Sequence, residues 1–341
     1  MDTKFGCLQT TIGSLPHKDA ARACAIVTHF LRDIPAWPQL PRRSFRENMY
    51  AQYSEGFPGI NATEAKTYVD RTQDLTRPLA QFYEDHMNNR FGNYGVSADY
   101  AAGLHKFLTL ENLTCRAVKG QVTGPVTWGM TVTDETGKAI LYDETLGDVV
   151  PKFLRLKASW MEQELRRLCK DTIVFIDEPY MSAFGSVGMQ LSRQQVISLI
   201  TETMSGLTGY KGIHCCGNTD WSILLQTPVD IINFDAYAFA GSLAVYDREV
   251  KRFLGRGGVV AWGIVPTDAE SVLKETPATL KDRLEEAMAP FTRNGVPFRT
   301  LVEQSLLTPA CGLAPIGSED AAERALELLT NLSRLMRQKY L

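Results

Sequence analysis

The sequence predicts a single, elaborated (β/α)8 TIM barrel of the α/β class over residues 1–341. Short apolar, β-rich segments alternate with amphipathic helical segments, and this alternation calls for a parallel sheet. Eight such units can be counted along the chain, which favours a closed barrel over an open sheet. The 341 residues accommodate a barrel of roughly 250 residues together with insertions.

The strand candidates share a short apolar run that ends in small or polar residues and is followed by a helical stretch. They are residues 8–14, 34–39, 117–124, 173–178, 212–216, 229–235, 258–263 and 307–312.

Three helical segments carry the clearest signals. Residues 149–169 place apolar side chains at helical spacing on one face. The segment 192–204 begins at Ser192, whose hydroxyl suits an N-cap. The last helix begins at Ser318, and the acidic residues in its first turn suit the helix dipole. These helices are expected to cover the outside of the barrel.

Residues 40–113 are longer than a normal connection between two strands of a barrel. We therefore predict a helical insertion around residues 40–113 within the single domain.

Composition and charge exclude several classes of protein. Hydrophobic residues make up 44% and charged residues 22%, which is typical of a soluble globular protein and not of a disordered one. The net charge of −3, without a basic cluster, gives no expectation of a nucleic-acid or membrane partner. No apolar run reaches 18 residues and the start, MDTKFG, is polar, so we expect a cytoplasmic protein.

The seven cysteines are an odd number and are irregularly spaced, which argues against a disulfide framework and for reduced thiols. In a barrel, catalytic residues cluster at the C-terminal ends of the strands. The predicted strand ends carry a dense set of hydroxyl, carboxylate, imidazole and thiol groups: Ser14, Thr123, Asp177, His214, Cys216, Asp235 and Cys311.

Some of these side chains suit a zinc site. Because side chains alternate along a strand, His214 and Cys216 point the same way. Cys311 ends the last strand, and the carboxylate of Asp235 ends the strand after the His-Cys pair. Two thiolates and an imidazole select zinc over magnesium or calcium. Ligands drawn singly from different strands are typical of a catalytic site and not of a structural one.

The residue pattern by itself leaves alternatives open. Buried free cysteine is common, so the His-x-Cys pair also fits an ordinary core. Asp177 in IDEP also fits a helix cap or a buried-network acid, and Ser14 in GSLP also fits a helix N-cap.

Five motifs, in order, resemble the catalytic half of cobalamin-independent methionine synthase. They are TTIGSLPH at 10–17, VKGQVTGPVT at 118–127, IDEP at 176–179, HCC at 214–216 and TPACGL at 308–313. The resemblance implies a (β/α)8 barrel that holds a zinc ion for the methylation of homocysteine. Carried over by position, it implies that His214, Cys216 and Cys311 are zinc ligands and that Asp235 stands where the family has a glutamate ligand.

The same resemblance implies a substrate site. The amino-acid end of homocysteine would be held by Ile12, Gly13 and Ser14, with Ser14 at its carboxylate. Asp177 would be the catalytic residue and would bind the amino group. Gln39 and Arg43 are further candidates for binding the substrate. Thr123 and Gly124 are candidates for the side of the site that faces the methyl donor.

The chain also departs from that family. Full-length members carry a second barrel that helps to hold the folate donor, and this chain has one. AWGIVP at 261–266 lacks the family's catalytic histidine, and WPQLPRRSFREN at 37–48 offers Gln39 and arginines where an amine-binding carboxylate is expected. GIHCCGNTDW at 212–221 also resembles the zinc methyltransferases that act between corrinoid proteins and coenzyme M. Both sets of motifs together resemble the short core methionine synthases, so a corrinoid donor such as methylcobalamin or a methylated corrinoid protein is expected in place of methyltetrahydrofolate.

The leading hypothesis is zinc-dependent methylation of homocysteine by a methylated corrinoid. A free alkyl thiol has a pKa of about 8.5, and binding to zinc expels its proton. One alternative keeps this chemistry with coenzyme M or another thiol as the acceptor. A second is a decarboxylase like the uroporphyrinogen decarboxylases of the same superfamily, which needs no metal. A third is a binding protein without activity, which gives the three candidate metal ligands no purpose.

Overall fold

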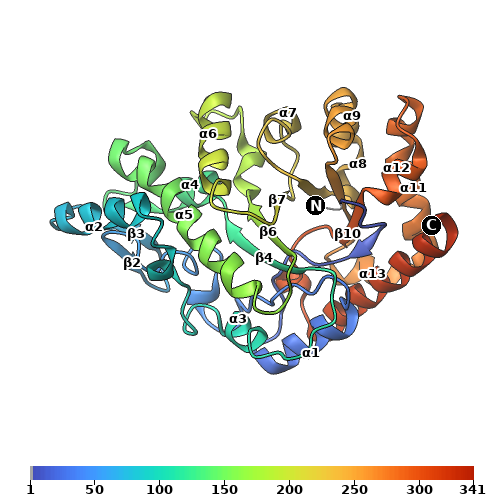
Figure 1. Ribbon diagram of the computed structural model, residues 1–341, viewed down its shortest axis with the longest axis horizontal. Helices are drawn as coiled ribbons and strands as arrows, with labels where there is room; N and C mark the ends of the chain where they lie inside the picture. Colours follow the sequence, from blue (N-terminus) through green and yellow to red (C-terminus); the bar gives the residue numbers. More distant parts are fainter. Residues whose placement is uncertain (1–2) are drawn as a thin grey trace.

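The computed structural model describes residues 3–341, in which parallel strands curl into a barrel with helices on its outside (Figure 1). Seven strands lie side by side in the order β1-β10-β9-β8-β7-β6-β4. They are β1 (Leu8–Gln9), β4 (Val118–Thr123), β6 (Thr172–Asp177), β7 (Tyr210–Cys215), β8 (Ile231–Asp235), β9 (Val259–Val265) and β10 (Ser305–Pro309). The predicted TIM-barrel class is confirmed, while the single-domain assignment over residues 1–341 stays a prediction.

The eighth position of the barrel is taken by residues 35–39, which do not form a continuous strand. Ala36 bridges Lys119 of β4, and Gln39 bridges Ser14, beyond the end of β1. Two of the five residues in this segment are prolines, which have no N–H to donate to a sheet ladder. The second predicted strand is therefore present as two isolated bridges that close the barrel.

The three helices predicted on the outside are present. The caps at Ser192 and Ser318 are confirmed, and the helix predicted over 149–169 begins earlier, at Glu144, after the cap Asp143. Ser192 forms a capping box with Gln195, and the Ser318 side chain accepts a hydrogen bond from the backbone of Ala321. Outside the insertion, the α-helices are α1 (Ala20–Phe30), α4 (Pro125–Thr131), α5 (Glu144–Leu165), α6 (Arg193–Met204), α7 (Trp221–Leu224), α8 (Ala236–Ala244), α9 (Asp247–Gly255), α10 (Ala269–Lys274), α11 (Pro277–Arg293), α12 (Phe298–Glu303) and α13 (Glu319–Tyr340). Short 3-10 helices lie at Ile140–Tyr142, Pro179–Ala183 and Ala314–Ile316.

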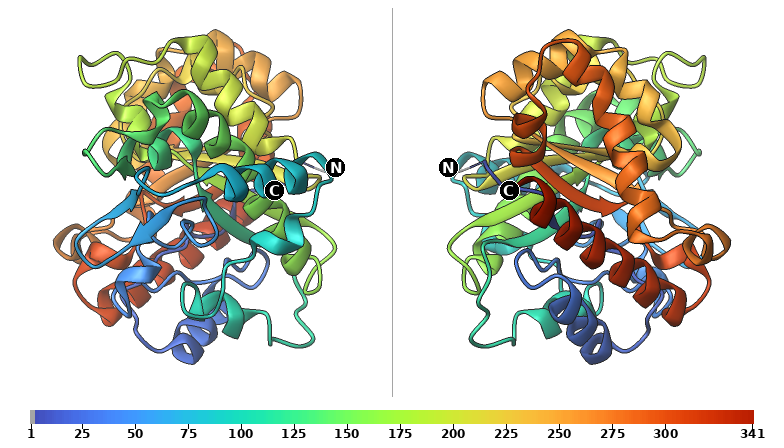
Figure 2. Two further views of the ribbon diagram at one scale, coloured as in Figure 1. Left: turned by 90° about the vertical axis from the view of Figure 1, so that its left-hand side faces the viewer. Right: turned by 90° about the vertical axis from the view of Figure 1, so that its right-hand side faces the viewer.

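The segment 40–113 contains helices and also a small sheet that the sequence did not predict (Figure 2). Strands of two or three residues are too short to show the alternation of polar and apolar side chains that reveals a strand. The elements are the 3-10 helices Phe45–Glu47 and Phe91–Tyr94, the helices α2 (Thr76–Met87) and α3 (Ala102–Phe107), and the strands β2 (Ile60–Ala62) and β3 (Thr67–Val69), which β5 (Thr133–Asp134) joins.

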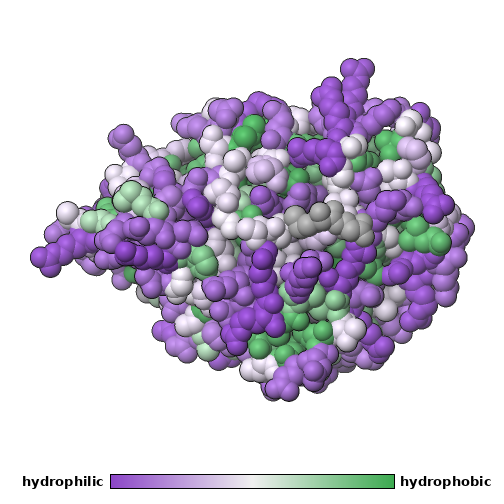
Figure 3. All heavy atoms as spheres, viewed as in Figure 1, coloured by the Kyte–Doolittle hydropathy of each residue, from purple (hydrophilic) through white to green (hydrophobic). Residues whose placement is uncertain are grey.

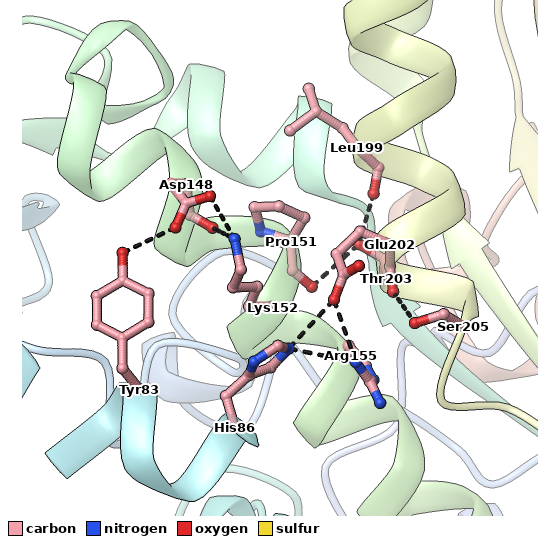
Figure 4. A network of polar contacts seen from close by, with 10 residues as sticks. All are labelled: Tyr83, His86, Asp148, Pro151, Lys152, Arg155, Leu199, Glu202, Thr203 and Ser205. Atoms are coloured by element: carbon pink, nitrogen blue, oxygen red, sulfur yellow. Dashed lines mark hydrogen bonds and ion pairs between the residues drawn. The ribbon is translucent and has the colours of Figure 1, made fainter. Parts of the chain in front are cut away.

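Polar contacts attach this segment to the outer helices (Figure 4). The Nε2 atom of His86, on α2, lies 3.2 Å from the carboxylate of Glu202 on α6. The guanidinium of Arg155, on α5, lies 3.3 Å from both of these side chains. Tyr83 donates its hydroxyl to Asp148 at 2.8 Å, so α2 is joined to two helices of the barrel.

The core has two parts, as expected of a barrel. A large apolar layer lies between the sheet and the outer helices. A smaller cluster fills the N-terminal part of the barrel interior: Phe5, Leu8, Ile34, Ala117, Ile173, Phe175, Tyr210, Ile231, Val259, Ala261 and Leu306. Most of the apolar filling therefore lies towards the N-terminal ends of the strands, and buried polar groups become more frequent towards the C-terminal ends.

Hydrophilic side chains dominate the face of the molecule seen in Figure 3, and apolar ones form scattered small groups there. Within residues 3–341, no helix has the length and apolar character that crossing a membrane requires.

Candidate metal centre and active site

The inward-facing side chains change from apolar to ionisable along the strands. On β6, Ile173 and Phe175 lie in the inner cluster, and Asp177 is the next residue on that face. On β7, Tyr210 lies in the inner cluster, and His214 is on the same face four residues later. The polar groups therefore gather at the C-terminal ends of the strands, where barrel enzymes place their active sites.

The structure brings three of the predicted metal ligands together. One donor atom from each of His214, Cys216 and Cys311 lies within 4.8 Å of the other two. Cys311 Sγ is 4.0 Å from His214 Nε2, although 97 residues separate the two in sequence. His214 is buried and both cysteines are half-buried. Two sulfurs and an imidazole nitrogen that converge from separate strands suit a zinc ion with an exchangeable position.

The two thiols differ in acidity. The hydrogen bond from Cys311, together with His214, lowers the pKa of Cys216 to about 4. The same hydrogen bond and burial raise the pKa of Cys311. One thiolate therefore sits beside one protonated thiol, and a bound cation would allow both sulfurs to ionise.

Asn233 sets the tautomer of His214. Its Nδ2 atom donates to the carbonyl of Ala261 and to the Thr308 hydroxyl, both at 2.8 Å, so its Oδ1 atom faces His214. That oxygen lies 2.5 Å from His214 Nδ1 and can only accept. Nδ1 therefore carries a proton, which leaves Nε2 as the ring nitrogen that faces the sulfurs and could bind a metal. Sequence reasoning missed Asn233, although a lone amide in the inward-facing register of an apolar strand is a usable signal.

Asp235 does not belong to the group of three. Its Oδ1 atom caps α8 by accepting a hydrogen bond from the backbone of Ala238 at 2.7 Å. Burial raises the pKa of Asp235, and the charge of Cys216 adds to this rise while His214 opposes it. The Asp235 carboxylate therefore feels the charges of Cys216 and His214 while it serves as the cap of α8.

Asp177 lies at the end of β6, in register with His214 on β7. It is 7% exposed, and its Oδ1 atom has no hydrogen-bond partner among the described residues. Burial raises the pKa of Asp177 to about 6, although His214 and Lys119 oppose this rise. A buried carboxylate oxygen without a partner is costly unless a ligand supplies one.

Ile12, Gly13 and Ser14 follow β1 and lie beside the centre. The backbone carbonyl of Ser14 accepts a hydrogen bond from Leu313 at 2.8 Å. A Cβ on Gly312, the residue after Cys311, would come within 2.1 Å of the Ser14 hydroxyl. Gly13 has a φ of +143°, and a Cβ there would lie 2.4 Å from the Gln121 amide, so only glycine fits.

Lys119 is a further residue of the site that sequence reasoning missed. Its side chain is fully buried, and Nζ donates to the carbonyl of Ile12 at 2.8 Å and to Gln121 at 3.2 Å. Burial lowers the pKa of Lys119 to about 8, and the charge of Asp177 opposes this shift. The available signal was a lysine in VKGQV that shares the inward register of Gln121.

Gln39 and Arg43 have separate surroundings. Gln39 is buried and donates to Gln52 at 2.7 Å and to the Tyr53 hydroxyl at 3.2 Å. Burial and then the charge of Asp177 raise the pKa of Tyr53, the residue whose hydroxyl accepts from Gln39. Arg43 instead forms an ion pair with the buried carboxylate of Glu47 at 2.6 Å.

Thr123 and Gly124 end β4 beside β6. The Thr123 hydroxyl donates to the carbonyl of Met49 at 2.8 Å, which ties β4 to the insertion. A Cβ on Gly124 would lie 2.3 Å from the Glu178 carboxyl group. That carboxylate accepts hydrogen bonds from the backbone and hydroxyl of Thr127, so this contact holds the start of α4.

Solved structures share this fold at low sequence identity. A B12-independent methionine synthase from Shewanella sp. W3-18-1, in complex with selenomethionine, matches 97% of this chain and 98% of its own, with a TM-score of 0.59 and 15% identity. A putative vitamin-B12 independent methionine synthase from Listeria monocytogenes matches 98% of both chains, with a TM-score of 0.57 and 13% identity. A methyltransferase from Methanosarcina mazei matches 98% of this chain and 94% of its own, with a TM-score of 0.56 and 16% identity.

No family profile matches the sequence, and no curated protein matches it either. The likeness to solved structures extends over nearly the whole of each chain. The chain therefore has the barrel fold of these methionine synthase and methyltransferase structures.

Proposed function

We propose that this protein is a zinc-dependent methyltransferase that methylates the thiol of homocysteine to give methionine. The observation that carries the proposal is the convergence of His214, Cys216 and Cys311 at the C-terminal end of the barrel. Two sulfurs and one imidazole match the donor set of catalytic zinc sites, which keep a position that a substrate can enter.

The residues present fit a zinc ion. Bound Zn²⁺ supplies Lewis-acid chemistry that lowers the pKa of a substrate thiol from about 8.5, so that the sulfur is nucleophilic at neutral pH. Cys311 would have to lose its proton to serve as a zinc ligand, while Cys216 already favours the thiolate. His214 offers Nε2 because Asn233 holds the proton on Nδ1.

The proposed reaction requires no base from the protein. The proton of the substrate thiol leaves to solvent when the sulfur enters the site. The sulfur then forms a bond to the methyl carbon, while the bond between that carbon and the donor breaks with its electron pair staying on the donor. The contribution of the chain is to position the two reactants and to exclude water at the end of the barrel.

Asp177 supports an amino acid as the thiol substrate. Its unpartnered, buried Oδ1 atom suits an ammonium group, and the Ser14 hydroxyl beside Cys311 suits the substrate carboxylate. Lys119 supports the same role because it fixes the Ile12 carbonyl. A thiol that carries a sulfonate and no amine, such as coenzyme M, would leave Asp177 unpaired.

For the methyl donor we propose a corrinoid, either methylcobalamin or a methylated corrinoid protein. AWGIVP at 261–266 has no histidine to protonate a departing folate. Thr123 and Gly124, at the end of β4, are proposed to border the donor side. The names of two of the matching structures describe those proteins as B12-independent, which makes the donor the first point to test.

The test is an anaerobic assay of zinc-loaded protein with homocysteine or coenzyme M as acceptor and methylcobalamin or methyltetrahydrofolate as donor. We expect methionine from methylcobalamin and none from the folate. Methionine from the folate alone would reject the corrinoid donor and keep the zinc chemistry. Transfer to coenzyme M alone would reject homocysteine. Protein that binds no zinc would reject the whole proposal and favour decarboxylase-like chemistry.

Asp235 is proposed as the fourth zinc ligand, and two variants separate this role from its role as a helix cap. Asp235→Asn keeps an oxygen acceptor for the backbone of Ala238 and removes the charge. If the carboxylate binds zinc, Asp235→Asn weakens zinc binding without lowering thermal stability. Unchanged zinc affinity in Asp235→Asn, with reduced stability in Asp235→Ala, would leave Asp235 as a cap alone.

A further inference from the structure

Two cysteines outside the candidate metal centre lie side by side at the N-terminal end of the barrel. Cys115 lies three residues before Val118 of β4, and Cys169 lies three residues before Thr172 of β6. Val118 and Thr172 are paired in the sheet. Adjacent parallel strands lie about 4.8 Å apart. Disulfide-bonded residues have Cα atoms about 4.4–6.8 Å apart, so the entry to two paired strands has a suitable spacing.

The side chains are in contact. Cys169 Sγ donates to the backbone carbonyl of Cys115 at 3.5 Å, and the Cys169 side chain is near enough to the Cys115 thiol to raise its pKa. Both residues are half-buried, so a small oxidant can reach them. Cys7 and Cys24 differ in both respects, because they are buried and donate to backbone carbonyls in other parts of the fold.

The surroundings favour a stable disulfide once it has formed. Burial, and then the neighbouring Cys169, raise the pKa of Cys115 to about 12. Some disulfides are strongly oxidising because their reduced form is stabilised as a thiolate. The reduced Cys115–Cys169 pair has no such stabilisation. Asp33 acts in the same direction, since its charge also disfavours a thiolate at Cys115.

We propose that Cys115 and Cys169 form a reversible thiol–disulfide site that reacts with small oxidants of the peroxide or disulfide class. With a peroxide, the sulfur of Cys169 takes an oxygen atom and becomes a sulfenic acid, and the peroxide is reduced to water, because the raised pKa of Cys115 disfavours the thiolate form that reacts with peroxides. The second thiol attacks that sulfur, the S–S bond forms, and a second water leaves. Two electrons and two protons pass from the thiols, and a dithiol restores the reduced pair.

The disulfide would link the start of β4 covalently to the start of β6, at the end of the barrel opposite the candidate metal centre. The link would close a loop between residues 54 apart in sequence. By the chain-entropy relation, a loop of this size in a chain of 341 residues raises the midpoint of thermal unfolding by roughly 5 °C. Because the site lies away from His214, methyl transfer should survive the oxidation.

The test equilibrates zinc-loaded protein in glutathione buffers of increasing oxidised fraction, traps free thiols with N-ethylmaleimide and maps tryptic peptides without reduction. Trypsin releases Cys115 in residues 107–116 and Cys169 in residues 168–170. We expect these two peptides to be linked in the oxidised protein and separated by dithiothreitol. The link should be absent from Cys115→Ser and from Cys169→Ser and present in the matched control Cys24→Ser.

Full labelling of both cysteines by N-ethylmaleimide in the most oxidising buffer would reject the site. Glutathione attached to either cysteine, without a link between them, would reject the pairing. The two serine variants are independent, so failure of one to fold leaves the other. The thermal midpoint provides a second readout, because oxidation should raise it in the unsubstituted protein and in Cys24→Ser only.

Discussion

His214 can offer one ring nitrogen to a metal because Asn233 engages the other. At the residue scale, the candidate site depends on such specific contacts of single side chains. Cys216 and Cys311 share a proton, Asp177 keeps an oxygen without a partner, and Lys119 is buried beside it. Each of these groups is costly in an apolar interior unless a ligand or a neighbour compensates it.

Replacing Cys311 by serine should abolish both zinc retention and methyl transfer. A serine hydroxyl is a much weaker zinc ligand than a thiolate. The measurement is zinc per protein after dialysis, together with methionine formed from methylcobalamin. Cys24→Ser is the control, because Cys24 donates only to the Gly103 carbonyl. Full activity of Cys311→Ser would show that the zinc-site assignment is wrong.

Replacing Asn233 by alanine should weaken zinc binding by about 10- to 100-fold, the usual cost of losing a partner that orients a histidine ligand. The variant leaves His214 Nδ1 without the acceptor that fixes its tautomer. Competition with a zinc chelator gives the affinity. Thr308→Ser serves as the control, since it keeps the hydroxyl that accepts from Asn233. Equal affinities for Asn233→Ala and Thr308→Ser would contradict the role assigned to Asn233.

Replacing Lys119 by methionine should raise the KM for homocysteine by about 10- to 100-fold, with a smaller effect on kcat, because a charge-assisted hydrogen bond to the Ile12 carbonyl is lost. Steady-state kinetics separate the two parameters. Lys119→Arg, which keeps the charge, should recover part of the affinity. A fall in kcat at constant KM would place the role of Lys119 in the chemical step and not in substrate positioning.

At the scale of elements, α5 connects the barrel to the insertion. Lys157 of α5 is fully buried and donates to the carbonyls of Tyr94 and Gly95 in the insertion, at 3.4 and 3.2 Å. The Phe153 ring lies 4.9 Å from the same ammonium group. One buried cation therefore joins the end of the 3-10 helix Phe91–Tyr94 to the longest helix on this side.

Lys157 should make stability depend on pH in the alkaline range. Burial lowers its pKa from 10.5 to about 7. Between these values the unfolded chain holds a proton that the folded chain does not, so the contribution of Lys157 to stability rises with pH and is fully unfavourable below about 7.

Chemical denaturation of the unsubstituted protein and of Lys157→Met at pH values from about 7 to about 10 tests this prediction. The free energy of unfolding of the unsubstituted protein, minus that of the variant, should increase with pH. A difference that stays constant across the range would contradict the lowered pKa.

At the scale of the whole molecule, the candidate ligands tie together distant parts of the chain. His214 and Cys216 lie at the end of β7, and Cys311 follows β10, with β8 and β9 between them. A metal bound there would bridge strands that are not neighbours. Binding to the folded barrel and not to the unfolded chain would therefore stabilise the fold.

Zinc at 100 times its dissociation constant should add about 2.7 kcal/mol to the free energy of unfolding, which is roughly 2–4 °C in a chain of this size. Calorimetry with zinc and with a chelator measures the shift. Cys311→Ser should show little or no shift. An equal shift in Cys311→Ser would mean that zinc binds elsewhere.

The sequence by itself determined the barrel and its helices. Eight strand signals, together with the caps at Ser192 and Ser318, depend on local patterns that a linear reading resolves. It also placed His214, Cys216 and Cys311 at strand ends, where the topology of a parallel barrel brings side chains together.

Only the tertiary structure decided the partners of these side chains. The role of Asn233 depends on contacts across β7, β9 and β10, and the burial of Lys119 depends on how residues 35–39 close the barrel. Asp235, which the sequence places like a ligand, also caps α8 because the chain turns directly from β8 into that helix. Such contacts join residues far apart in sequence, and no local propensity encodes the distance between them.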